Sequence, residues 1–129
     1  MTDRLVWAGA KGGDAHRRRP LPVATSETCA FRPVMFEALR AADIPFRVMT
    51  DATNIDAASA AIRTDLGVAA TLASVMPAEV AMLDAGSGLP ELPNFTIALH
   101  FPGTGPTAVA AELAQDIREA FTMRLRAVA

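Results

Sequence analysis

Hydrophobic and polar positions along the chain predict short strands and amphipathic helices that follow one another. Strand positions form short apolar runs or alternate with polar residues, whereas helix positions repeat at steps of three and four. We expect strands at 5–8, 21–25, 46–49, 68–72, 80–83 and 95–101, and helices at about 29–42, 55–66 and 106–126. Alternation of the two element types predicts an α/β fold with a mainly parallel sheet and flanking helices.

The helix boundaries rest on capping residues and on proline. Pro33 is tolerated only in a first turn, so the first helix is expected to start no earlier than about Cys29. Thr53 resembles the start of a capping box for the second helix, and Gly67 stands where a left-handed C-terminal residue is expected. The apolar face of the last helix is Val109, Leu113, Ile117, Ala120 and Phe121.

Composition and charge narrow the classes of function. The chain has 129 residues and a formal charge of −2, so it creates no field that would gather nucleic acid or an anionic membrane. The one basic run, residues 16–19, suits a solvated loop better than a phosphate grip. A single cysteine and the absence of a long apolar run indicate a soluble cytoplasmic protein.

Two loops are candidates for binding because each lies between a predicted strand and the helix that follows it. Residues 25–28 and residues 50–54 both offer hydroxyls and free backbone N–H groups, which suit a carboxylate or a phosphate. In a parallel sheet such loops meet at the carboxyl ends of the strands. The same residues also fit an interpretation in which they only cap helices.

The pattern offers no catalytic or metal centre. Cys29 as a nucleophile would need His16 or His100 as its base, and neither lies near it in the sequence, so a small buried thiol is the better interpretation. Two isolated histidines and one cysteine do not make a metal site. We therefore expect no enzymatic activity, no metal and no cofactor.

Nearly the whole chain resembles the effector-binding domain of LysR-type transcriptional regulators. No single segment is a sharp motif, and the specificity lies in the order and spacing of all of them. The segments are Leu5-Val6-Trp7, Pro20-Leu21-Pro22-Val23-Ala24, Cys29-Ala30-Phe31-Arg32, Glu37-Ala38-Leu39, Ala42-Asp43-Ile44-Pro45, residues 61–69, Leu89-Pro90-Glu91-Leu92-Pro93 and the strand through His100.

The resemblance implies a fold like that of type 2 periplasmic binding proteins. In that fold two α/β subdomains are joined by two crossover strands, and a small effector binds between the subdomains. Residues 5–8 would be the first crossover strand and 9–92 the second subdomain. Residues 94–129 would be the return strand and the terminal helix of the first subdomain. The DNA-binding helix-turn-helix and the first half of the sensor domain would lie outside this chain.

The resemblance also implies a set of effector-binding residues and a set of partners. By position in the family, the residues that would contact the effector are Thr25, Ser26, Glu27, Thr28, Phe31, Thr50, Asp51, Thr53 and Gly67. The expected ligand is a small anionic molecule, with no direct nucleic-acid contact and no membrane contact. The apolar faces of strand 95–101 and of the last helix would need a partner surface, which predicts a homo-oligomer such as a dimer. The alternative is a stand-alone interaction protein that pairs with related regulators through those faces.

Overall fold

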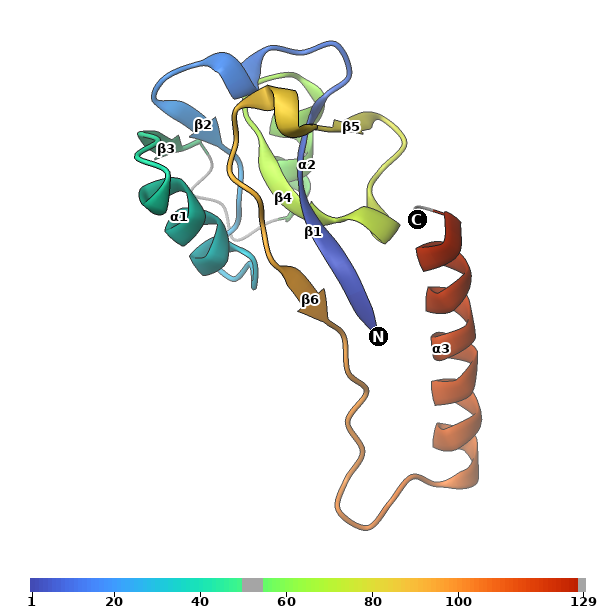
Figure 1. Ribbon diagram of the computed structural model, residues 1–129. Helices are drawn as coiled ribbons and strands as arrows, with labels where there is room; N and C mark the ends of the chain where they lie inside the picture. The colour runs from blue at the N-terminus through green and yellow to red at the C-terminus, as the bar shows by residue number, and fades with distance from the viewer. Residues whose placement is uncertain (50–54, 128–129) are drawn as a thin grey trace.

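The structure is a computed structural model that describes residues 1–49 and 55–127, and it has the expected α/β character (Figure 1). Six strands, three α-helices and three short 3-10 helices (η) are found in these residues. In chain order they are β1 Thr2–Ala10, η1 Ala15–Arg17, β2 Leu21–Val23, α1 Arg32–Ala41, β3 Phe46–Val48, α2 Ile55–Arg63, β4 Ala69–Leu72, η2 Ala73–Val75, β5 Val80–Met82, η3 Ala85–Ser87, β6 Asn94–Thr96 and α3 Ala108–Ala127.

Strand β1 is the centre of the larger sheet. Its C-terminal part pairs with β4 on one side, with Trp7 opposite Ala70, and with β5 on the other, with Gly9 opposite Ala81. Its N-terminal part pairs with β6, with Asp3 opposite Phe95. All three pairings are antiparallel, so the prediction of a mainly parallel sheet is wrong for this sheet.

The parallel part of the structure is small. Strands β2 and β3 form a two-stranded parallel sheet, and a parallel bridge from Val23 to Val68 joins it to the start of β4. Every strand except β1 therefore runs in one direction. The alternation of strands and helices predicted that common direction. It could not indicate that β1 lies in the middle of the sheet and runs in the opposite direction, because tertiary packing decides which strands are neighbours.

The two faces of the sheet are covered by different helices. Alternate side chains of a strand point to opposite faces, so Trp7 and Ala70 share one face while Ala8 and Ala69 share the other. On the first face Met35 of α1 packs into a core of large side chains. The other members of this core are Trp7, Ala15, Leu21, Val23, Leu39 and Val68, with Leu83, Leu89 and Leu92 against it.

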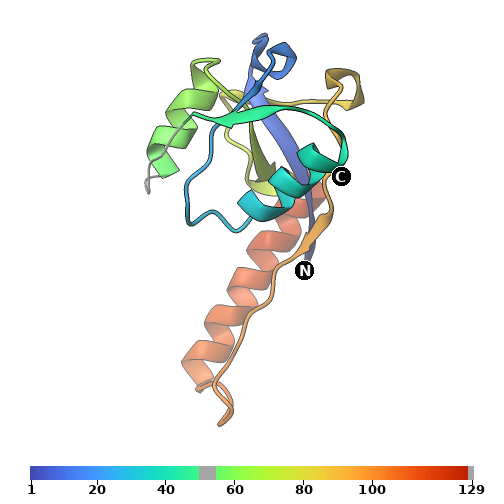
Figure 2. The same cartoon turned by 90° about the vertical axis from the view of Figure 1, so that its left-hand side faces the viewer.

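The second face is covered by α2 through small residues. Ala58 and Ala61, three positions apart on α2, pack with Ala24 and the partly buried Ile62. Figure 2 shows α1 and α2 as separate helices around the strands, and Figure 1 shows α3 apart from both. The helices thus form two outer layers, and the layer of α2 meets the sheet through side chains that fill little volume.

One helix boundary agrees with its expected limit and another differs from expectation. Helix α1 begins at Arg32, within the limit of no earlier than about Cys29, because the Cys29 and Arg32 N–H groups donate to carbonyls three residues back and form turns before it. Helix α2 ends at Arg63, and the left-handed residue after it is Asp65, with φ of 57°, rather than Gly67. Gly67 instead lies against the backbone of β2, where a Cβ atom would stand 3.0 Å from the Pro22 carbonyl oxygen.

Strand β6 is shorter than the strand predicted at 95–101. The Ile97 N–H still donates to the Met1 carbonyl at 2.7 Å, and the ladder with β1 ends there. Residues 98–101 have no ladder partner among the described residues, although their alternation is regular. Figure 1 shows this segment leading away from the sheet toward α3.

Helix α3 is where the sequence predicted it, but its apolar face is mostly uncovered. Ala114 is buried, and Ile117 and Phe121 are half-buried. By contrast Val109 is 76% exposed and Leu113 58% exposed, as is Met123 at 68%. The prediction that this face is buried is therefore wrong for Val109, Leu113 and Ala120 within this chain.

Candidate ligand pocket

A cavity of about 880 Å³ lies on the face of the sheet that α2 covers. Its walls come from the loop before α1, from α2, from β1 and β4, and from the turn before β5. The lining residues are Ala8, Ala24, Thr25, Ser26, Thr28, Cys29, Ala30, Phe31, Asp56, Ala58, Ser59, Ile62, Arg63, Ala69, Ala70, Thr71, Pro77 and Val80. The volume lies within the range of small-molecule sites in proteins.

The cavity brings together four of the nine residues that the sequence nominated. Thr25, Ser26, Thr28 and Phe31 all line it. Glu27 is exposed and is not a lining residue. Gly67 is buried against β2 and does not line the cavity either. The remaining three, Thr50, Asp51 and Thr53, lie outside the described residues.

The hydroxyls of the first loop do not cap α1. The N-cap residue is Phe31, which has helical backbone angles, and no side chain makes a capping hydrogen bond there. The loop is held by backbone instead, since the Cys29 N–H donates to the Ser26 carbonyl at 3.3 Å. Ser26 is buried and Thr28 exposed, and both border the cavity. For α1, the interpretation that these residues only cap a helix is therefore not supported.

Aromatic contacts connect this loop to its surroundings. The Phe31 ring, a wall of the cavity, meets the Phe95 ring of β6 edge to face, with centroids 4.9 Å apart. The next residue, Arg32, lies over the Phe36 ring at 5.1 Å. Its Nη1 atom is buried and has no hydrogen-bond partner among the described residues. Any movement of Phe31 would therefore disturb the contact between the Phe31 ring and Phe95 of β6.

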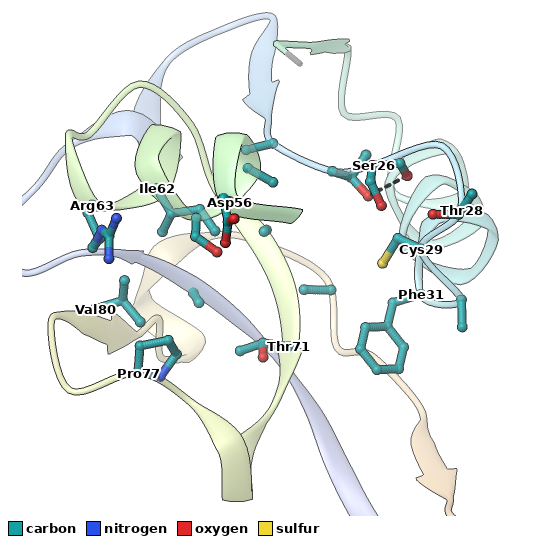
Figure 3. Close-up of a pocket in the computed structure, with 18 residues that line it drawn as sticks. Ser26, Thr28, Cys29, Phe31, Asp56, Ile62, Arg63, Thr71, Pro77 and Val80 are labelled. Carbon is teal, nitrogen blue, oxygen red and sulfur yellow. Dashed lines mark hydrogen bonds between the residues drawn. The ribbon is translucent and has the colours of Figure 1, made fainter. Parts of the chain in front are cut away.

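Sequence reasoning missed the contribution of α2 and β4. Asp56, Ser59 and Arg63 line the cavity from α2, and Thr71 lines it from β4 (Figure 3). The available signal was the run of alanines at 57, 58, 60 and 61, which leaves space between a helix and a sheet.

Cys29 also borders the cavity, which the sequence did not predict. Figure 3 shows its sulfur directed toward the cavity from the loop before α1. The side chain is half-buried, and the thiol is free. In the described part of the chain no group of three or more His, Cys, Asp or Glu side chains is arranged to hold a metal ion.

The basic run at 16–19 contains a structural ion pair. The Arg18 guanidinium donates to the carboxylates of Asp14 and Asp65 and, at 2.7 Å, to the Asp65 carbonyl. Burial alone would raise the pKa of Asp65. Hydrogen bonds from the N–H groups of Asp14 and Ala15, with the Arg18 charge, hold that pKa below its ordinary value. This network, which we call the Arg18 clamp, ties the loop after β1 to the end of α2.

Two further polar contacts hold β1 in place. The Trp7 indole N–H donates to the Pro90 carbonyl at 2.8 Å, which fixes the returning segment against the sheet. The buried carboxylate of Asp3 accepts hydrogen bonds from the hydroxyl and the N–H of Ser74 in η2. Nothing in the sequence pattern indicates this role of Asp3.

Comparison with known proteins finds similarity to two bacterial regulators. The chain is 28% identical over 122 residues to the HTH-type transcriptional regulator DgdR of Burkholderia cepacia, which covers 94% of this chain and 42% of that protein. It is 32% identical over 72 residues to the HTH-type transcriptional regulator PecT of Dickeya dadantii (strain 3937), which covers 56% of this chain and 23% of PecT. No family model matches the chain.

These matches leave most of each relative uncovered. The chain spans less than half the length of the curated relatives it matches. Among the described residues, no helix has the length and apolarity needed to cross a membrane. Over most of its length, the chain is similar to part of an HTH-type transcriptional regulator.

Proposed function

We propose that this chain is the small-molecule-sensing module of a LysR-type transcriptional regulator, with its effector in the cavity beside α2. The observation that carries the proposal is that Thr25, Ser26, Thr28 and Phe31, nominated from the sequence, border one cavity. The similarity to two HTH-type regulators supports a regulatory role rather than catalysis. The DNA-binding activity of the regulator would belong to a segment other than residues 1–129.

The anionic group of the effector would bind at the loop before α1. The Ser26 and Thr28 hydroxyls border the cavity there, and no hydrogen bond joins either hydroxyl to another described residue. Hydroxyl and N–H donors near the start of a helix favour a carboxylate. The Ser26 and Thr28 hydroxyls are therefore hydrogen-bond donors at one end of the cavity, and neither is used to cap α1.

The signal would leave the lobe through β6. Phe31 contacts Phe95, and β6 pairs with the first part of β1, so the two strands that would join the subdomains lie together next to the cavity. A ligand that favours one position of Phe31 would shift the population between open and closed subdomain arrangements. The common direction of β2, β3, β4 and β5, with β1 opposed, is compatible with the proposed periplasmic-binding-protein-like lobe.

The experiment is a thermal-shift screen of small organic anions, followed by calorimetry on the Thr28→Val variant. The variant removes one hydroxyl and keeps the shape of the side chain, so affinity should fall about 5- to 10-fold without loss of folding. Thr104→Val, in an exposed turn away from the cavity, is the matched control and should bind as the unmodified chain does. Unchanged affinity in Thr28→Val would remove that residue from the site.

A second candidate function is supported by the uncovered face of α3. Val109, Leu113 and Met123 are more than half exposed, which is typical of a surface that binds a partner. The chain would then act as an interaction protein that pairs with related regulators, or with itself as a dimer. Sedimentation at micromolar concentration tests it, since Leu113→Glu should dissociate the complex. A compact monomer of the unmodified chain would count against the proposed homodimer.

A further inference from the structure

We infer that the cavity is built for a monocarboxylic acid with an extended apolar tail, and this inference rests on the proposed function. It names the chemical class of the ligand, which the position of the binding loop alone does not. The argument has three parts: the floor of the cavity, its far end, and the charges at its rim.

The floor of the cavity consists mainly of alanine side chains, with Thr71 of β4 as its polar member. Ala8 and Ala69 are cross-strand partners on the face of the sheet that lies under α2. Ala24 and Ala58, from β2's end and from α2, continue the same surface. Methyl groups offer no hydrogen bonds. A polar part of the ligand placed above them would lose its bound water and gain nothing in return, so that part of the ligand is expected to be apolar.

The two ends of the cavity differ in chemistry. Figure 3 shows Ser26, Thr28 and Cys29 at one end of the view, and the apolar side chains of Ile62, Pro77 and Val80 at the other, with Arg63 beside them. The lining residues of α2 extend from Asp56 to Arg63, which at 1.5 Å per residue is about 10 Å along the helix axis. The cavity therefore has room for an extended chain that begins at the hydroxyls and ends among apolar side chains.

The charges among the lining residues favour one carboxylate rather than two. Asp56 and Arg63 are the charged side chains in the lining, and both are exposed, so they lie at the rim in contact with water. An exposed cation gains little from pairing with an anion. A second carboxylate at the far end would meet Arg63 only at the exposed rim, where an ion pair adds little, and would lose hydration against the half-buried Ile62 and the buried Val80.

The test measures how carboxylic acids of increasing chain length bind to the 129-residue chain. The chain is labelled with nitrogen-15, and binding is followed by NMR through the chemical shifts of its backbone amides. The probes are acetate, butanoate, hexanoate and octanoate. Each methylene buried on the alanine floor should increase affinity about 3- to 4-fold. Adipate, which has the length of hexanoate and a second carboxylate, should bind at least about tenfold more weakly than hexanoate. Affinity that does not change along the series, or adipate binding as tightly as hexanoate, would overturn the inference.

A matched pair of variants assigns the effect to the cavity. Ala69→Ile places a larger side chain on the floor and should abolish the dependence on chain length, with acetate affinity retained. Ala81→Ile, on the edge strand β5 and outside the lining, is the control and should keep the dependence. If Ala69→Ile does not fold, Ala69→Val provides the same test with a smaller increase in volume.

The outcomes separate this inference from the proposed function. If small polar anions shift the amides of residues 24–31 while tail length has no effect, the ligand class is wrong and the sensing function stands. If no probe and no compound of the thermal-shift screen shifts any amide of the lining, both are wrong.

Discussion

The two faces of the sheet hold side chains of very different size. The face of Trp7 is filled by Leu21, Val23, Met35 and Leu39, and is covered by both α1 and the segment that follows β5. The face of Ala8 meets α2 through alanines and leaves a cavity of about 880 Å³. One backbone scaffold thus has a tightly packed core around Leu39 on one side, the closed face, and on the other a cavity where the sheet meets α2 through small side chains.

The largest effect is expected on the closed face. Leu39 has no exposed surface and lies in the core of large side chains. Leu39→Ala should lower the free energy of unfolding by about 2–5 kcal/mol, because it removes buried methyl groups and leaves a void that the neighbours fill only in part. Urea denaturation followed by circular dichroism measures this. A loss below about 1 kcal/mol would mean that the face is not closed.

A pair of enlargements contrasts the two faces directly. Ala15→Ile adds volume to the packed core and should cost about 1–3 kcal/mol. Ala69→Ile adds the same volume beside the cavity and should change stability by less than about 1 kcal/mol. Thermal unfolding of the two variants gives the comparison, and equal losses would contradict the contrast between the faces.

Trp7→Phe tests how the returning segment is held against the closed face. The substitution removes the indole N–H that donates to the Pro90 carbonyl and leaves that oxygen without its donor. We expect a loss of about 1–2 kcal/mol. Hydrogen exchange should show faster opening of residues 84–93 and unchanged protection of α2, which packs on the other face.

The Arg18 clamp predicts a pH dependence at the end of α2. The pKa of Asp65 is lowered in the folded chain, so its contribution to stability is complete above the unfolded pKa near 4. The contribution is lost as pH falls through the lower folded value. Asp65→Asn keeps a residue that tolerates the left-handed conformation and removes the charge, so the variant should lose less stability than the unmodified chain between pH 5 and pH 3. Identical pH profiles in acid unfolding would exclude this role.

The sequence predicted the elements better than their pairing. Periodicity located α1, α2 and α3 to within a few residues, because each has apolar residues at helical spacing. Pairing depends on which strands tertiary packing brings together, so the antiparallel position of β1 could not be inferred from its own residues. The strand at 95–101 shows the same limit, since regular alternation does not supply a partner strand.

The candidate site was predictable only on its polar side. Ser26 and Thr28 carry the hydroxyls that mark a loop between strand and helix, and the sequence displays them directly. Ala8 and Ala69 could not be recognised as the floor from the sequence, because alanine is common in helices and strands alike. They form the floor only because the strand register makes them cross-strand partners.

Strand β1 also has a consequence for synthesis of the chain. It is synthesised before all of its partner strands, which come late, since Leu5 pairs with Leu72 and Thr2 with Thr96. During translation the apolar segment around Trp7 has no partner strand to pair with until β4, β5 and β6 have left the ribosome. Such a segment is open to aggregation or to capture by chaperones for that interval. The strand that organises the finished sheet is thus the one exposed for the longest time before the sheet exists.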